Sequence, residues 1–472
     1  MSPASIGERL LSAIDHAETP TALAGSLAFT PPAFTPANAL ADRFLHVTLY
    51  VTVVSSFFVF IEPAPYEYLA FVLGFACVLA RVTMCRVILP LLVLLLFRDL
   101  GGAIGLAKIA LSGWMRVTGE PDATVITVEY QDSIRFLAVS FYLGLTAVLF
   151  ACILSQDTVR RMATLKAAYI TAAVIACALG TIAYFQLIPG FDIFMLDTSR
   201  ATGGFKTPND FGGFLIAPLM WLFEGFIVGK IKARNVVATA IILTGLLLSF
   251  SRGAWGSTVL AAALIIYLLF VTQHDARIRR RIVFFVAIGA VVLVALLVVL
   301  SSIGTVGQMI AERSQLQDYD VNADNRSRFQ LEIDSFHEMF NHPLGMGPWG
   351  FAHATNWVSH DTFLGTMLNH GWIGGTAYMT LIAVTLWIGF CALWQRAPWQ
   401  SLLVASYSAF VALVLEGVWG DTDHWRAFYI VLGVVWGLVA ATQKAVWRVR
   451  NYRAAPVVKP GVLAVPQNSG PP

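Results

Sequence analysis

The sequence predicts an all-α, polytopic membrane protein, and two observations carry this prediction. Of the 472 residues, 57% are hydrophobic and only 12% are charged, whereas about 25% of the residues of a soluble domain are charged. Near-chargeless runs of roughly twenty residues recur along the chain, which is the length that a helix needs to cross the hydrocarbon layer. The weak alternation of membrane β-strands is missing from these runs. We therefore expect a bundle of membrane-spanning helices.

About twelve such segments lie between two polar tails, residues 1–43 and 447–472. They cover 44–61, 66–82, 87–97 with an extension that can reach 113, 134–153, 163–186, 210–229, 235–250, 254–271, 281–302, 371–394, 399–418 and 425–444. Segment 87–113 is the exception, because Arg98 and Asp99 interrupt its apolar run. We interpret it as one crossing followed by an interfacial piece. Helices one to nine then occupy 44–302, and helices ten to twelve occupy 371–446.

The basic residues of alternate loops indicate the orientation. They gather at Arg81 and Arg86, Arg160 to Lys166, Lys230 to Arg234, Arg277 to Arg281, Arg396, and Lys444 to Arg453. Cytoplasmic loops carry the excess of Lys and Arg, so these loops and both tails should be cytoplasmic. The long polar segment 303–370 then faces outward. The formal net charge of +3 does not indicate a nucleic-acid partner, and the five cysteines show no metal or disulfide spacing.

The outward segment contains a candidate general base. His360 follows Ser359 at the start of a stretch that is too short to span and that ends before Gly371. We expect a short helix there, close to the outer surface. The dipole of a helix start lowers the pKa of a histidine and favours the neutral imidazole. An ordinary interfacial histidine would give the same pattern.

Three arginines are expected on the same side. Arg200 opens a glycine-rich turn that includes Lys206 and leads into a helix near Pro208, and both glycine and a helix start favour an anion. Arg252 lies in the short connection between two apolar segments, where an arginine usually has a partner or a task. Each pattern is equally typical of a snorkelling cation.

Arg328 lies in the first turn of a predicted helix whose apolar residues recur at helical spacing up to Phe340. An arginine at that end opposes the helix dipole, which favours an external anion over a solvated face. Taken together, these arginines and His360 predict an anion-binding, acid-base site. Arginine binds phosphate oxygens bidentately, and a lipid-linked sugar diphosphate is an anionic donor that arrives already activated.

Other residues are secondary candidates for this site: Lys206, Arg326, His370, Glu416 and Arg426. Glu416 qualifies because an intramembrane carboxylate is a functional candidate by default. The segment 421–424 (Asp-Thr-Asp-His) offers possible metal ligands, but such spacing is common in polar turns, and Arg426 could pair with it. We assign no metal and no cofactor.

These residues resemble the O-antigen ligase and O-antigen polymerase superfamily. Its motif of a His, a polar residue, nine residues and a glycine pair stands here as His360-Asp361 followed by residues 371–374 (Gly-Trp-Ile-Gly). Residues 251–255 (Ser-Arg-Gly-Ala-Trp) and the segments 328–347 and 200–209 are similar to further family elements. The sequence departs from the family at Asp361, which is usually an amide or a hydroxyl, and at His370, which is often Glu.

The resemblance implies a GT-C-like helical fold and an inverting, metal-independent glycosyltransferase of the bacterial inner membrane with its active site facing the periplasm. The donor would be a glycan linked to undecaprenyl diphosphate, with His360 as the base and Arg252, Arg328 and, more weakly, Arg200 on the diphosphate. The acceptor would be a second glycan in a polysaccharide polymerase or lipid A core in a ligase, that is, exopolysaccharide or lipopolysaccharide biosynthesis. A transporter or flippase of lipid-linked glycans is the alternative, although transporters tend to bind near mid-membrane.

Overall fold

The computed structural model describes residues 36–60, 63–117, 123–196, 200–273, 275–301, 328–355 and 358–454. By its contacts the chain divides into two units, Met1–Phe44 and Leu45–Pro472. The described residues of the first unit form the beginning of helix α3 (Pro36–Val54).

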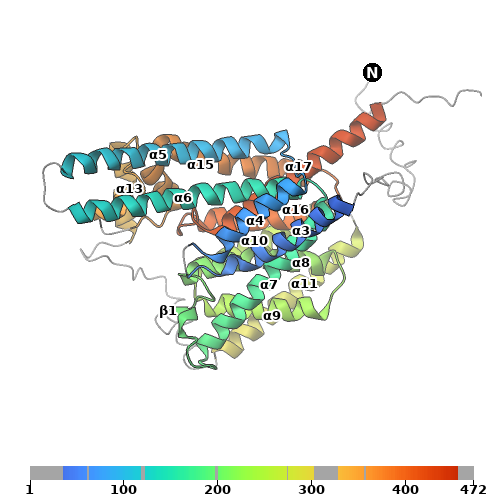
Figure 1. Cartoon of the computed structure of the whole chain (residues 1–472). Coiled ribbons are helices and arrows are strands. Elements are labelled where there is room, and N and C mark those ends of the chain that lie inside the picture. The colour runs from blue at the N-terminus through green and yellow to red at the C-terminus, as the bar shows by residue number, and fades with distance from the viewer. Residues whose placement is uncertain are drawn as a thin grey trace, which may run out of the picture. The chain divides into compact units, whose positions relative to one another are not determined.

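Helices make up most of the described part of the second unit (Figure 1). After α3 they are η1 (Ser55–Phe57), α4 (Pro65–Leu79), η2 (Arg86–Ile88), α5 (Leu89–Val117), α6 (Ala123–Leu154), α7 (Thr158–Tyr184), η3 (Asp192–Phe194), α8 (Pro208–Ile227), α9 (Ala233–Leu248), α10 (Arg252–Thr272), α11 (Ala276–Ser301), α13 (Arg328–Asn341), α14 (Gly350–Thr355), α15 (Thr362–Leu393), α16 (Gln400–Glu416) and α17 (Arg426–Ala454). Among the described residues, β1 (Met195–Leu196) pairs antiparallel with β2 (Arg200–Ala201). Two-residue strands are too short to leave a periodic signal in the sequence.

Seven of the described helical segments are long and apolar enough to cross a membrane: Arg86–Lys108, Gln131–Leu154, Thr158–Tyr184, Pro208–Ile227, Arg252–Thr272, Thr362–Leu393 and Arg426–Arg448. Helices α4, α9 and α16 are apolar but shorter. The chain is therefore an all-α, multi-pass membrane protein, as the sequence predicts. The number of twelve spans and the GT-C-like arrangement stay predictions.

Helix α5 (Leu89–Val117) runs without a break through Arg98 and Asp99. The interpretation of 87–113 as one crossing followed by an interfacial piece stays a prediction. The two side chains are buried and form an ion pair of 2.7 Å. Because an internal partner offsets the cost of a charge in an apolar environment, the helix has no need to break there.

Several helices that are distant in the sequence pack side by side. Helix α5 lies along α15 and beside α6 (Figure 1), while α6 packs against α17, and α16 packs against α8 and α10. Helices α8 and α17 are the most buried of the candidate spans, and large side chains such as Trp221 and Trp436 are almost fully buried there. Many apolar side chains of α4 and α11 are exposed, as a lipid-facing surface requires.

Helix α15 contains a break that the sequence predicts. Gly371 has φ +65° and ψ −174° and interrupts the helical geometry, in a region of backbone space that is essentially restricted to glycine. A Cβ at this position would lie 2.6 Å from the carbonyl carbon of Leu344. The short stretch after His360 is thus a short helical segment, residues 362–370, joined to a membrane helix at Gly371.

Candidate functional site

Arg200 and the residues before Arg252 form one hydrogen-bonded cluster. The Nε of Arg200 donates to the carbonyl of Ser249 at 3.0 Å, and its Nη2 donates to Asn209 Oδ1 at 3.2 Å. The Ser251 hydroxyl donates to the same Asn209 oxygen at 2.9 Å and also caps α10 by accepting from Ala254 N. The glycine-rich turn 200–209 is therefore fastened to the connection that carries Arg252. Much of the hydrogen-bonding capacity of Arg200 is used within the protein.

Arg252 is exposed and is the first residue of α10. A Cβ on its neighbour Gly253 would lie 2.7 Å from Glu416 Oε1 and 2.7 Å from Trp419 Nε1, so only a glycine allows this approach. The Glu416 side chain is buried, and its Oε2 has no hydrogen-bond partner among the described residues. The structure thus brings Glu416 and the turn that follows it next to Arg252.

Helix α13 holds the segment that carries His360. The Glu332 carboxylate accepts two hydrogen bonds of 2.7 Å, one from Ser359 Oγ and one from the backbone N–H of His360. Helix α13 begins at Arg328 and ends at Asn341, which matches the predicted helix. The Arg328 side chain and Arg326 lie outside the described residues, so their proposed roles stay predictions.

On its other side, His360 is followed by a capped helix start. Asp361 accepts from the backbone N–H groups of Phe363 at 2.8 Å and Leu364 at 3.0 Å, which is the geometry of an N-cap. Burial raises the pKa of the Asp361 carboxyl, although these two N–H groups oppose the rise. Aspartate at this position therefore acts first as a helix cap.

Thr362 connects this helix start to residues 417–425, which we name the 417–425 turn. Its backbone N–H donates to Gly417 O at 2.7 Å, and its hydroxyl donates to Gly420 O at 2.7 Å. The same hydroxyl oxygen accepts from the backbone N–H of Thr422 at 2.7 Å. Since the turn begins directly after Glu416, the contacts connect the neighbourhood of Arg252 to that of His360 through one short stretch of chain.

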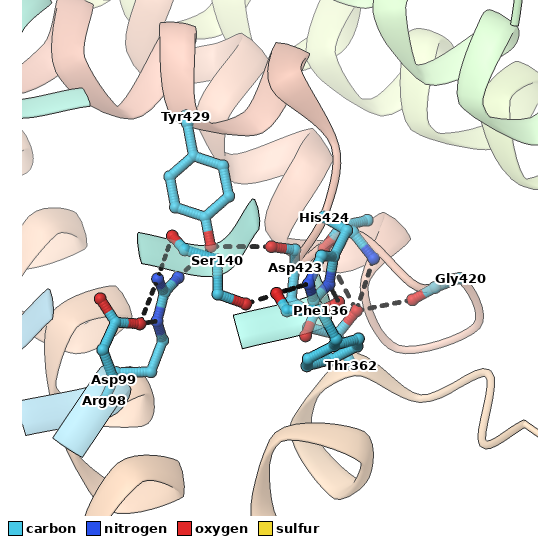
Figure 2. A network of polar contacts seen from close by, with 10 residues as sticks. Arg98, Asp99, Phe136, Ser140, Thr362, Gly420, Asp423, His424 and Tyr429 are labelled. Carbon is cyan, nitrogen blue, oxygen red and sulfur yellow. Dashed lines mark hydrogen bonds and ion pairs between the residues drawn. The ribbon is translucent and has the colours of Figure 1, made fainter. Parts of the chain in front are cut away.

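A buried polar network contacts the turn (Figure 2). Arg98 Nη2 donates to Asp99 Oδ1 at 2.7 Å and to the backbone carbonyl of Ser140 at 2.5 Å, and Nη1 donates to the Tyr429 hydroxyl. Tyr429 in turn donates to the backbone carbonyl of Asp423 at 2.7 Å. Arg98 is 1% exposed. Helices α5, α6 and α17 are thereby joined at one guanidinium.

Within the turn, His424 has two side-chain partners. Its Nδ1 lies 2.9 Å from Asp423 Oδ1, and its Nε2 lies 3.0 Å from Ser140 Oγ. Asp421 lies beside them and interacts with Asp423. Burial and the neighbouring Asp423 raise the pKa of Asp421 well above its usual range. Burial acts in the same sense on Asp423, but His424 outweighs it and holds the pKa of Asp423 below its usual range. Of the two carboxyls, Asp421 therefore has the higher pKa.

The remaining candidates occupy different environments. His370 is buried, with both ring nitrogens lacking a partner among the described atoms, and a Cβ on Gly102 would lie 2.5 Å from its Nδ1. Arg426 pairs with Glu67 and donates to Phe58 O at 3.3 Å, so its suggested pairing with the aspartates of 421–424 is corrected by a partner distant in the sequence. Lys206 is exposed.

A small recess, partly open to solvent, lies beside this assembly. Its lining includes Phe136, Trp349, Ser359, Asn369 and Asp421. It therefore adjoins the residue before His360 and the Asp421 carboxyl of the turn. No group of three or more His, Cys, Asp or Glu side chains that could hold a metal ion occurs within the described ranges.

Sequence reasoning missed three parts of this assembly. Glu332 resembles any acidic residue on the polar side of an amphipathic helix. Arg98 and Asp99 were noticed only as an interruption of an apolar run, although intramembrane charges are themselves a functional signal. Tyr429 lies in an apolar segment, and nothing local indicates the partner of its hydroxyl.

Part of the chain matches a known family model. Residues 237–379 match the family model described as O-antigen ligase. The matched range contains Arg252, Arg328, Glu332, His360 and His370, whereas Arg98 and the 417–425 turn lie outside it. No curated protein matches the chain.

Proposed function

We propose that this chain transfers a glycan from undecaprenyl diphosphate to an acceptor hydroxyl, and the match of residues 237–379 to the O-antigen ligase family model supports this proposal. The reaction would take place at the periplasmic face of the bacterial inner membrane. One observation carries the proposal: His360 is fixed between Glu332 and the Asp361 cap, and Thr362 joins it to the turn that contacts Gly253. A base and an exposed arginine are thereby held on one framework.

The chemistry assigns one role to each group. The neutral His360 imidazole takes the proton from the acceptor hydroxyl, and the oxygen of that hydroxyl forms a bond to the anomeric carbon of the donor glycan. The bond from that carbon to the diphosphate oxygen breaks, and undecaprenyl diphosphate leaves with the electron pair. Attack from the face opposite the leaving group inverts the anomeric configuration. No metal ion takes part in the proposed reaction.

Arginine side chains balance the charge that grows on the leaving group. Arg252 is exposed at the first turn of α10, where the backbone N–H groups add to its positive field. Arg328 begins the helix that positions His360 through Glu332. Arg200 has a supporting role in this proposal, because its hydrogen bonds to Ser249 and Asn209 shape the connection before Arg252.

A variant series tests the assignment. We expect His360→Ala to reduce transfer by at least about 100-fold, the usual contribution of a general base, while the protein still retains undecaprenyl diphosphate. Arg252→Ala should instead reduce that retention. His342→Ala is the matched control, because His342 lies in the same outer segment and pairs with Glu338 at 3.3 Å. Full activity of His360→Ala would refute the mechanism, and loss of activity in a chelator would show that a metal takes part.

The product distinguishes the two activities within the superfamily. A strain that lacks a ligase should carry lipid A core without any O-chain, whereas a strain that lacks a polymerase should carry single-repeat caps or lose secreted polysaccharide. Gel analysis of both polymers in a deletion strain measures this directly. Normal transfer by an extract of the deletion strain, with lipid-linked glycan accumulating on the cytoplasmic side, would identify a flippase instead.

A further inference from the structure

Arg98 is placed where a charge is costly. It lies in the candidate span Arg86–Lys108 and is 1% exposed, and ionisable residues inside membrane helices are rare unless they have a task or a partner. Asp99 provides the countercharge. The ion pair with Asp99 uses the Nε and Nη2 groups of Arg98. The guanidinium makes further hydrogen bonds, to Tyr429 and Ser140.

Those contacts converge on the 417–425 turn. Arg98 Nη1 donates to the Tyr429 hydroxyl, and that hydroxyl donates to Asp423 O at 2.7 Å. Arg98 Nη2 donates to Ser140 O at 2.5 Å, and the hydroxyl of Ser140 lies 3.0 Å from His424 Nε2. The guanidinium therefore reaches residues 423 and 424 by two routes, each with one intermediate residue (Figure 2).

The turn passes this restraint to the start of α15. Thr422 N donates to Thr362 Oγ1 at 2.7 Å, and Thr362 follows Asp361 and His360 directly. Thr362 also donates to Gly420 O and Gly417 O. Three hydrogen bonds thus join the helix start to a turn that is itself held from within the membrane.

We propose that Arg98, acting through Tyr429 and Ser140, is a positioning residue for glycan transfer. It fixes the 417–425 turn, and the turn fixes the start of α15 and so the place of His360. This inference rests on the proposed function. Because none of the contacts described for Arg98 involves Arg252 or Arg200, its loss should lower kcat and leave the KM for the donor unchanged.

The geometry of the guanidinium makes the role specific to arginine. A lysine at 98 would keep the charge that Asp99 requires, but one ammonium cannot serve Asp99, Ser140 and Tyr429 together in the planar arrangement of an arginine. Charge and positioning can therefore be separated in one pair of variants. Tyr429→Phe separates them further, since it removes one hydroxyl and no charge.

The experiment uses the purified full-length protein with lipid-linked glycan isolated from the source strain. We expect Arg98→Lys to keep the melting temperature close to wild type and to lose roughly 10- to 100-fold in kcat, the scale of a small misplacement of a catalytic group. Tyr429→Phe should show a kcat loss of the same kind. Arg98→Met is expected to lose both stability and kcat, and the other two variants keep the test decisive if it does not fold.

Lys166→Met is the matched control. Lys166 pairs with Glu224 at 2.9 Å, so its replacement also breaks an ion pair between helices, with no hydrogen-bonded route to the 417–425 turn among the contacts described. We expect it to lower the melting temperature while kcat per folded molecule stays unchanged. Wild-type kcat in both Arg98→Lys and Tyr429→Phe would overturn the inference. Absence of transfer by the wild-type protein would instead overturn the proposed function.

Discussion

Replacement of Glu332 by alanine removes both hydrogen bonds that fix the segment before α15, the bonds from Ser359 Oγ and from His360 N, each 2.7 Å long. A hydrogen bond to a charged group contributes about 1.5–3 kcal/mol. Glu332 is only partly buried, and water compensates for part of the loss, so we expect a net cost of about 1.5–3 kcal/mol, one bond rather than two. The equilibrium constant for the ordered segment then falls about 10- to 100-fold.

The assay is kcat for transfer by purified protein, which should fall by up to that factor in Glu332→Ala. Glu332→Gln retains one acceptor oxygen and should be intermediate, and Ser359→Ala removes only the side-chain bond. Glu338→Ala is the control on the same helix, because its carboxylate faces His342 and is 39% exposed. A wild-type kcat in Glu332→Ala would show that the base is not held through Glu332 or is not His360.

Two further outcomes follow from the same geometry. Gly371→Ala places a Cβ 2.6 Å from the Leu344 carbonyl carbon at φ +65°. The strain should cost at least about 1–3 kcal/mol and lower the melting temperature. Gly256→Ala is the control and should leave the melting temperature unchanged, because a Cβ there meets nothing within 4 Å. Asp421 has a raised pKa in the fold, so its contribution to stability is complete below the unfolded value of about 3.9 and is lost as the pH rises toward the folded value. Asp421→Asn removes this loss, and its melting temperature should gain on wild type as the pH rises above about 4. A difference that is constant with pH would contradict the raised pKa of Asp421.

Local patterns in the sequence predict much of the fold, because each membrane helix shows itself in its own composition. The helix at 328–341 and the break at Gly371 follow from apolar spacing and from a glycine. What local patterns could not predict are the contacts between distant segments. In the sequence, Arg98 only interrupts an apolar run, because Tyr429, whose hydroxyl it contacts, lies 331 residues away. Arg426 was paired with nearby aspartates, whereas Glu67 is 359 residues away.

The candidate site divides in the same way. His360 and Arg252 stand in short motifs that are visible in the sequence, and their connection through Glu416 and Thr362 depends on tertiary packing. Glu332 could not be found in advance, since one carboxylate on a polar helix face is ordinary until the backbone it binds is known. The place of Arg328 relative to these residues stays a prediction.

The pairing of Arg98 with the next residue in the chain also bears on how the protein is made. Helix α5 is synthesised and inserted long before Tyr429 emerges from the ribosome, so during that interval neither the tyrosine nor the 417–425 turn can stabilise the guanidinium. Asp99 is present from the start and lies 2.7 Å away in the finished fold. Helix α5 can therefore enter the bilayer with the charge of Arg98 already compensated by Asp99. Helix α17, which is made later, then adds Tyr429 to an ion pair that is already in the membrane.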